Sequence, residues 1–387
     1  MAEPETKKKT STPSSIMSDW SQLPEELLYL ISTHLEEENC FDVVHARSVC
    51  TSWRSAFPFP SSLLWPSYSL PSFGKFPLES KDLCTLQKIP LFLFRVKTPL
   101  DSDAAEYFLG GIGRDESEEN HMELLPSLLQ CSVKVKIPGS DPTLLNMLDC
   151  QIIPLGHQYR MIGWNLSSMA ILPLNKEDKR GQFVVLLNTS RYLLVLTSVE
   201  MRWKRLEGVP TSYCTGLITF KGRFYANFLS KQIVVIDPYS LEVTLLFPSP
   251  QEIAPYLVLS GNDELFLVEV RFPPFGVSDI SRFTCRVCRL DEEAGTWAEV
   301  NDLGDCVFFI CQLGNVSISA KELPYGCGLT GNSILCTHMP SNVTFAFKYG
   351  VHTGNAEDDL NCWRYSRENP VVKLNTSFPV MTLRVER

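Results

Sequence analysis

The sequence predicts a small all-α module of three helices followed by a large all-β domain, which we expect to be a β-propeller. Two patterns along the chain indicate this fold class. Apolar residues recur at three- and four-residue steps within residues 19–58, which is the period of a helix. Beyond residue 90 they form short runs separated by turn residues, which is typical of antiparallel strands.

The first helix is predicted by the segment that begins at Leu23. Its apolar residues form one stripe, which we expect to be buried: Leu23, Leu27, Leu30, Ile31 and Leu35. Pro24 suits the first turn, where its missing N–H costs nothing, and Glu25 and Glu26 face the positive end of the helix dipole. These residues together mark a helix start.

A second apolar cluster follows an acidic break at residues 36–39. It fits two short helices and contains Val43, Val44, Val49, Cys50, Trp53 and Phe57. Three helices in about forty residues enclose a core that is too small to make the module stable by itself. We therefore expect a partner to complete an apolar face of this module.

The chain divides into four predicted regions. Residues 1–18 lack apolar periodicity and should be a disordered leader, and residues 19–58 form the helical module. Prolines punctuate residues 59–90, which we expect to be a linker without a long helix. Residues 91–387 form the β domain.

Hairpins and a weak repeat favour a propeller within the β domain. Four hairpins are predicted, with turns at Asn188, Gly222, Tyr239 and Asn262. Three segments resemble the outer strand of a repeated unit, centred on Trp203, Val243 and Trp297. Their spacing gives units of roughly 40 to 50 residues, and about six or seven such blades would fit the domain.

Composition argues against several partners. The formal net charge of -9 does not favour a DNA or RNA surface. No apolar run approaches the length that crosses a bilayer, and no apolar stretch follows the lysines at residues 7–9 as in a secretory signal. We expect no nucleic-acid or membrane partner, and a location in the nucleus, the cytoplasm or both.

We expect no catalytic, cofactor or metal site. Cys285 and Cys288 have CxxC spacing, but strand alternation would point them to opposite faces and no second pair exists. The glycines at residues 110–113 lack the Lys-Ser/Thr of a phosphate loop and should form a surface turn. The histidines form no metal-binding pair, and the serines lie in no GxSxG elbow.

Two separated clusters in the helical module resemble an F-box. They are LPEELL at residues 23–28 and RSVCTSWR at residues 47–54, and both agree with that family in order and spacing. The β domain resembles the propeller of plant F-box proteins of the Skp-interacting-partner, KIB-like group. The matching stretches are residues 94–97, 221–226, 234–246, 286–310 and 316–334, whereas residues 98–170 find no match.

This resemblance implies a non-catalytic substrate-receptor subunit of an SCF E3 ubiquitin ligase. The F-box would dock on the Skp adaptor and through it on cullin, and the β domain would recruit an unknown protein substrate. The residues we assign to adaptor binding are Leu23, Pro24, Leu27, Ile31, Leu35, Val44, Val49, Cys50 and Trp53. For Leu27 and Trp53, a core role and an interface role are equally open.

Two other functions remain open. The first is an F-box and propeller scaffold that acts outside a ligase. The second is a propeller enzyme, which would require convergent polar residues on the loops of one face.

Overall fold

The structure is a computed structural model that divides the chain into two compact units, Met1–Pro60 and Ser61–Arg387. It describes residues 22–34, 46, 50–57, 67–71, 83–98, 101–114, 122–125, 129–132, 144–146, 150–161, 168–174, 181–189, 192–246, 255–272, 283–311, 314–323, 329–338, 345–357, 363–365, 370–375 and 380–385. The predicted leader lies outside these residues.

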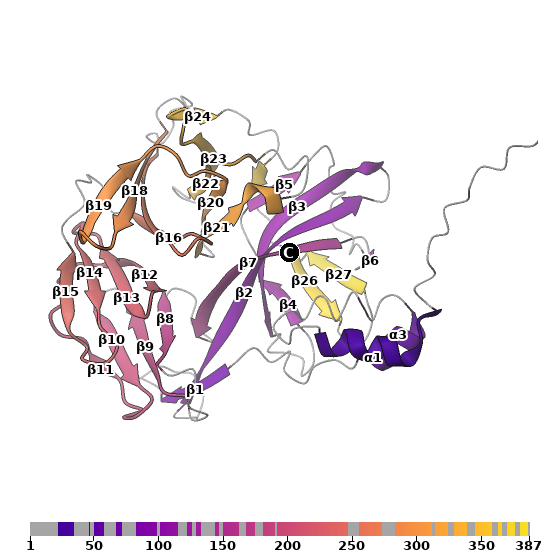
Figure 1. Cartoon of the computed structure of the whole chain (residues 1–387), viewed down its shortest axis with the longest axis horizontal. Coiled ribbons are helices and arrows are strands. Elements are labelled where there is room, and N and C mark those ends of the chain that lie inside the picture. The colour runs from indigo at the N-terminus through magenta and orange to yellow at the C-terminus, as the bar shows by residue number, and fades with distance from the viewer. Residues whose placement is uncertain are drawn as a thin grey trace, which may run out of the picture. The chain divides into compact units, whose positions relative to one another are not determined.

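The first unit is helical. Helix α1 spans Glu25–His34 and helix α3 spans Thr51–Ala56, and residue 46 between them is also helical. Figure 1 shows both helices in indigo. Two of the three predicted helices therefore lie among the described residues.

The described residues of the second unit lie mostly in strands, and three of its sheets are four-stranded antiparallel meanders (Figure 1). Blade 2 contains β8 (Met169–Pro173), β9 (Phe183–Asn188), β10 (Leu193–Thr197) and β11 (Lys204–Arg205). Blade 3 contains β12 (Cys214–Phe220), β13 (Arg223–Phe228), β14 (Ile233–Ile236) and β15 (Val243–Leu246). Blade 4 contains β16 (Tyr256–Leu259), β17 (Leu265–Arg271), β18 (Thr284–Asp291) and β19 (Thr296–Val300).

Blade 5 has five strands in the order β21-β20-β22-β23-β24. They are β20 (Cys306–Cys311), β21 (Gly314–Ser319), β22 (Ser333–His338), β23 (Phe345–Gly350) and β24 (Asn355–Glu357), with the short 3-10 helix η4 (Ala320–Glu322) after β21. The chain places β20 and β22 side by side in parallel, whereas the other pairs in this blade are antiparallel.

We call the ten-stranded sheet blade 1, and it takes strands from both ends of the unit. Its early strands are β1 (Ser67–Pro71), β2 (Leu83–Thr98), β3 (Asp101–Arg114), β4 (Met122–Leu125), β5 (Leu129–Ser132), β6 (Leu144–Asn146) and β7 (Cys150–Met161). Its late strands are β25 (Trp363–Tyr365), β26 (Pro370–Asn375) and β27 (Val380–Val385). β26 pairs with β4 and β27 pairs with β6, so late and early strands share one sheet.

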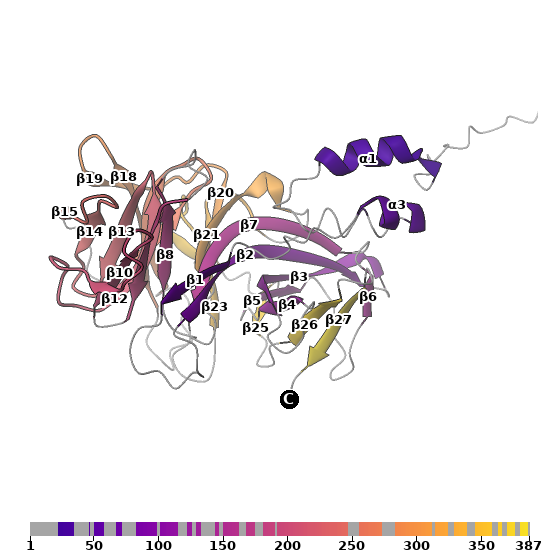
Figure 2. The same ribbon diagram turned by 90° about the horizontal axis from the view of Figure 1, so that it is seen from below.

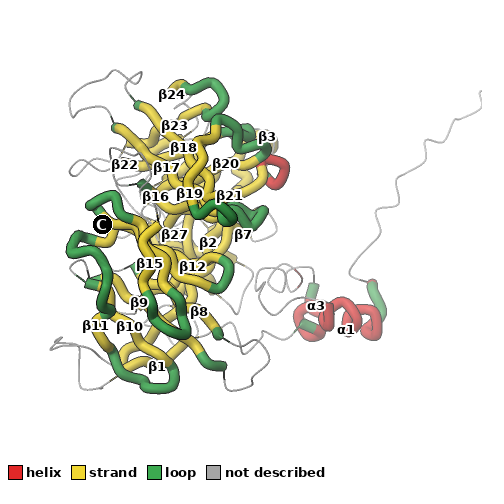
Figure 3. Tube along the Cα trace, turned by 60° about the vertical axis from the view of Figure 1, so that its left-hand side comes forward, coloured by secondary structure: helices red, strands yellow, loops and turns green. Residues whose placement is uncertain are grey.

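The five sheets form a closed ring, which makes this unit a five-bladed β-propeller. The inner strands β7, β8, β12, β16 and β21 contact one another in a cycle. One apolar cluster fills each space between neighbouring blades, and the cluster that contains Leu93, Phe309 and Leu335 joins blade 5 back to blade 1. Figure 1 looks down on the blades, and Figures 2 and 3 show their strands from two other sides.

Strands in the middle of a blade are apolar on both faces because each face packs against another blade. In β9, Val184 and Leu186 belong to the cluster with blade 3, whereas Val185 and Leu187 belong to the cluster with blade 1. This explains why the sequence shows continuous apolar runs here rather than simple alternation.

The prediction of six or seven blades is wrong, and so is the prediction of a surface turn at residues 110–113. Strands β2, β3 and β7 are long, and all the strands from β2 to β7 enter one sheet instead of adding blades at the period of the later repeat. The glycines lie inside β3, where Gly111 pairs with Leu91 on one side and Leu125 on the other. The expected linker at residues 59–90 contains β1 and the first half of β2.

The local predictions in blades 2 to 4 are confirmed. All four predicted hairpins form, between β9 and β10, β12 and β13, β14 and β15, and β16 and β17. The three repeated segments supply the outer strands β11, β15 and β19. Cys285 and Cys288 point to opposite faces of β18, since Cys285 packs in the cluster with blade 5 and Cys288 in the cluster with blade 3.

Candidate adaptor-docking helix and propeller polar network

Helix α1 begins as the sequence predicts. The carbonyl oxygen of Pro24 accepts hydrogen bonds from the backbone N–H groups of Leu27 and Leu28, both at 3.1 Å. Glu25 and Glu26 occupy the first turn, where carboxylates face the positive end of the helix dipole. These contacts confirm the helix start that the sequence predicts.

The helical unit has a very small core. Its buried members are Leu28, Ala46, Trp53 and Phe57, and the rings of Trp53 and Phe57 stack with centroids 5.3 Å apart. Leu23, Ile31 and Cys50 are half-buried against this core. Trp53 is therefore a core residue, which answers one of the two questions that the sequence left open.

The prediction of which α1 residues form the buried stripe is partly wrong. Leu28, which the stripe omitted, is fully buried, whereas Leu27 and Leu30 are 45% and 54% exposed. Leu27 and Leu30 are three residues apart, so they lie on one side of the helix, next to the buried stripe. The sequence could not separate the two sides because Leu27, Leu28, Leu30 and Ile31 are all apolar.

We call the exposed pair Leu27 and Leu30 the α1 face. Pro24 is exposed just before it, and Tyr29, 69% exposed, points to a different side of the helix. Leu35, Val44 and Val49 were also predicted to bind the adaptor, and they lie outside the described residues. The α1 face is the clearest uncovered apolar surface in the described part of the helical unit.

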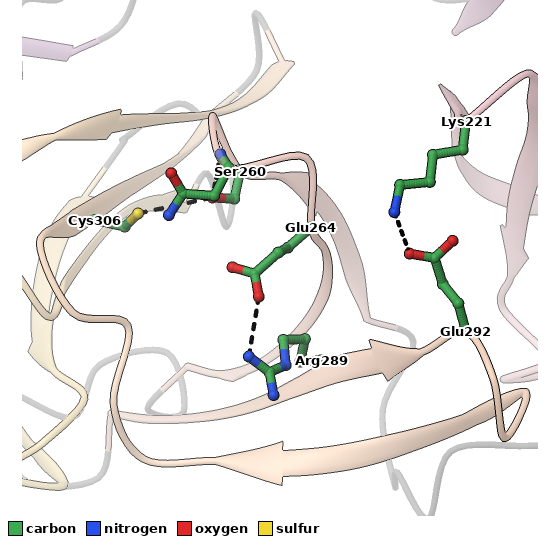
Figure 4. A network of polar contacts seen from close by, with 7 residues as sticks. Lys221, Ser260, Glu264, Arg289, Glu292 and Cys306 are labelled. Atoms are coloured by element: carbon green, nitrogen blue, oxygen red, sulfur yellow. Dashed lines mark hydrogen bonds and ion pairs between the residues drawn. The ribbon is translucent and has the colours of Figure 1, made fainter.

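Polar side chains of the propeller tie its turns together (Figure 4). The Lys221 ammonium lies 2.5 Å from the Glu292 carboxylate and joins the β12–β13 turn of blade 3 to the β18–β19 turn of blade 4. This hydrogen bond to Glu292 raises the pKa of Lys221. Within blade 4, Arg289 pairs with Glu264 at 3.0 Å. These exposed ion pairs give the carboxylates a structural role.

A propeller enzyme gains no support from this network. The Ser260 hydroxyl lies 3.8 Å from the Cys306 thiol, and the described contacts of this pair include no histidine that could act as a base. Among the described residues, no group of three or more His, Cys, Asp or Glu side chains could hold a metal ion. Burial raises the pKa of Cys214 to about 12, so this thiol is not a ready nucleophile.

Buried amides add a second set of contacts between blades. The Asn188 side-chain amide donates to Ser168 Oγ in blade 2 at 3.1 Å and to the Cys214 carbonyl of blade 3 at 2.8 Å. Asn227 repeats this pattern one blade later, since its amide donates to Thr215 Oγ1 at 2.8 Å and to the Pro255 carbonyl oxygen next to blade 4. Sequence analysis missed both residues, although each ends or nearly ends the second strand of its blade.

The fold and the helical surface together define a class of protein, a β-propeller preceded by a small helical module with an exposed apolar face. Comparison with protein families gives the same two parts: an F-box domain matches residues 20–62 and the KIB1-4 beta-propeller matches residues 114–359. The chain therefore belongs to the F-box proteins that carry a KIB1-4 β-propeller.

Curated relatives agree with this membership. The chain is 62% identical to the F-box/kelch-repeat protein At1g64840 of Arabidopsis thaliana, over 96% of this chain and 98% of that protein. It is 61% identical to the F-box/kelch-repeat protein At2g24250 of the same plant, over 98% and 99% of the two chains. The F-box protein SKIP23 of Arabidopsis thaliana is 28% identical over 79% of this chain and 81% of its own length.

Among the described residues, no helix is long and apolar enough to span a membrane.

Proposed function

We propose that this protein is a non-catalytic substrate receptor of an SCF E3 ubiquitin ligase. Its F-box docks on a Skp adaptor, which links it to cullin, and its propeller holds a protein target. Such a receptor needs no catalytic residue, because holding the target beside the conjugated ubiquitin raises the effective concentration of the two reactants. The protein would act in the nucleus, the cytoplasm or both.

The observation that carries this proposal is the α1 face. Leu27 and Leu30 stay exposed on α1, whereas Leu28 and Ile31 of the same helix pack into the core of a very small unit. A partner groove that covers both leucines would gain apolar contact at little cost in ordering, because α1 is already formed. Leu23, Pro24, Ile31, Leu35, Val44, Val49 and Cys50 are proposed to flank or support this contact.

Co-purification with a recombinant plant Skp adaptor and cullin tests the proposal. Wild type and three variants of the full chain are compared: the double variant Leu27→Ala with Leu30→Ala, the matched control Tyr29→Ala, and the core variant Leu28→Ala. We expect the double variant to bind the adaptor at least about tenfold more weakly, because truncating an interface anchor costs on the order of 1 kcal/mol or more. Tyr29→Ala should bind like wild type.

Circular dichroism separates loss of contact from loss of folding. The double variant should keep the helical signal and melting temperature of wild type, whereas Leu28→Ala should lower the melting temperature because it opens a cavity in the core. Failure of wild type to bind the adaptor would overturn the proposal. Binding of the adaptor without cullin would instead favour the scaffold that acts outside a ligase.

A further inference from the structure

Blade 3 ends in an open strand edge. Strand β15 is the last in the order β12-β13-β14-β15, and among the described strands it pairs with β14 alone. Figure 1 shows β15 on the outer rim of the ring. A strand with unpaired backbone groups along one side can take up a further strand there.

The register of the β14–β15 hairpin shows which backbone groups face outward. The Asp237 N–H donates to the Glu242 carbonyl oxygen at 3.1 Å, and hydrogen-bonded pairs alternate along an antiparallel ladder. The backbone of Thr244 therefore bonds to β14, whereas the N–H and C=O groups of Val243 and Leu245 point away from it. No residue in the described part of the chain bonds to these outward groups. We call them the β15 edge.

The outer strands of blades 2, 4 and 5 are shorter or charged. β11 contains only Lys204 and Arg205, and β24 is three residues long. β19 carries Glu299, which pairs with Arg286 at 2.5 Å. β15 has no charged residue, and its Leu245 is 53% exposed. Because short length and charge are what keep strand edges from pairing, β15 is the outer strand best suited to accept another.

The side chains along the β15 edge select the sequence of an occupant. Glu242 directly precedes β15, is exposed, and its carboxylate forms no hydrogen bond or ion pair with another described residue. Side chains directly opposite each other on paired strands interact, so we expect Lys or Arg opposite Glu242 and an apolar residue opposite Leu245. On an antiparallel occupant, the apolar residue comes three positions before the cation.

We propose that the β15 edge docks an extended segment of the target, which adds an antiparallel fifth strand to blade 3 and carries an apolar residue three positions before Lys or Arg. The backbone of this segment would bond to Val243 and Leu245. In strand addition, main-chain hydrogen bonds supply affinity and side-chain contacts supply selectivity. This inference rests on the proposed role as a substrate receptor.

Selection from a random-peptide phage library on the full chain tests the proposal. We expect the enriched peptides to carry the apolar-x-x-Lys/Arg pattern. Fluorescence anisotropy with the synthesised peptides should show at least about tenfold weaker binding to Leu245→Lys, which corresponds to about 1.4 kcal/mol. The matched control Val199→Lys should bind like wild type, because Val199 is 77% exposed in the β10–β11 turn, away from β15. Both variants change exposed residues, so both should melt at the wild-type temperature.

N-methylated peptides test the backbone pairing separately from the side chains. In a bound strand, N–H groups point alternately toward β15 and away from it. Methylation of an N–H that faces β15 should abolish binding, whereas methylation of the next residue should leave binding unchanged. Equal effects at the two positions would overturn strand addition.

Charge exchange tests the selectivity. Glu242→Lys should weaken the basic peptides and bind versions in which Glu replaces the cation. The proposal would be overturned by a lack of enriched peptides, by enriched peptides without the pattern, or by equal binding to wild type and Leu245→Lys. Sedimentation that finds dimers of wild type but not of Leu245→Lys would also overturn it, because the β15 edge would then join two copies of this chain.

The same protein preparations are also tested for adaptor binding. Leu245→Lys that loses the peptides and keeps the adaptor supports docking at the β15 edge. Wild type that binds the peptides but not the adaptor would leave this docking standing and would remove the ligase role.

Discussion

The indole nitrogen of Trp203 donates a 2.7 Å hydrogen bond to the carbonyl oxygen of Pro71, a residue 132 positions earlier in the chain. Trp203 precedes the outer strand of blade 2, and Pro71 ends strand β1 of the first sheet. The thiol of Cys84 also donates to this carbonyl, at 3.5 Å. One acceptor thus joins blade 2 to the start of the propeller.

We expect Trp203→Phe to lower the free energy of unfolding by about 1 kcal/mol beyond the loss of ring volume, because it removes this donor and keeps an aromatic ring. Trp297→Phe in blade 4 is the matched control, since the buried Trp297 Nε1 has no hydrogen-bond partner. Urea unfolding of both variants measures the difference. Equal losses in the two variants would show that the hydrogen bond adds nothing.

Gly216 should tolerate no side chain while Asn227 is present. A Cβ at Gly216 would overlap the Asn227 side-chain oxygen. We expect Gly216→Ala to cost about 1 to 3 kcal/mol through overpacking. In an Asn227→Ala background, the same substitution should cost clearly less, and the double-mutant cycle gives the coupling free energy. Additive effects would contradict this account.

The turn between β14 and β15 should weaken in acid. Asp237 accepts hydrogen bonds from the backbone N–H groups of Ser240 and Tyr239, both at 2.9 Å, and these bonds lower its pKa. A lowered pKa in the folded state means that this stabilisation is complete above the ordinary value of 3.8 and is lost as the pH falls through the lower folded value.

Asp237→Asn should therefore flatten the dependence of melting temperature on pH below about 4. Glu242→Gln is a suitable control, because the exposed Glu242 carboxylate forms no hydrogen bond or ion pair with another described residue. Identical pH profiles for wild type and Asp237→Asn would refute the role of this carboxylate.

The Cys214 thiol should resist alkylation in the folded protein. Its burial and a pKa of about 12 leave almost no thiolate at pH 8. Mass spectrometry after iodoacetamide treatment should find Cys214 unmodified in native buffer and modified in urea. Rapid modification in native buffer would show that blades 2 and 3 separate readily at this boundary.

The sequence predicts the contacts between near neighbours well. Each hairpin of blades 2 to 4 has its turn residues beside its apolar runs, so the pairing of β12 with β13 follows from about fifteen residues of sequence. The edge strand β1 was not predicted because prolines there suggested a linker, yet an edge strand can end in a proline such as Pro71 without losing a ladder hydrogen bond.

The arrangement of blade 1 could not be predicted, because its pairings join residues far apart in the chain. The contact of β4 with β26 depends on strands that carry no mutual signal in a single sequence. The candidate docking helix shows a similar limit on a smaller scale: periodicity located α1, but only packing against Trp53 shows that Leu28 is buried and Leu27 is exposed.

The shared sheet of blade 1 also sets the order of events during synthesis. Blades 2 to 4 contain only consecutive strands, so each can assemble soon after it leaves the ribosome. Strands β4 and β6 cannot complete their pairing until β26 and β27 have been synthesised, and β27 ends at Val385. A nascent chain thus carries open strand edges until β26 and β27 have left the ribosome, and a chain that stops before β26 would keep them.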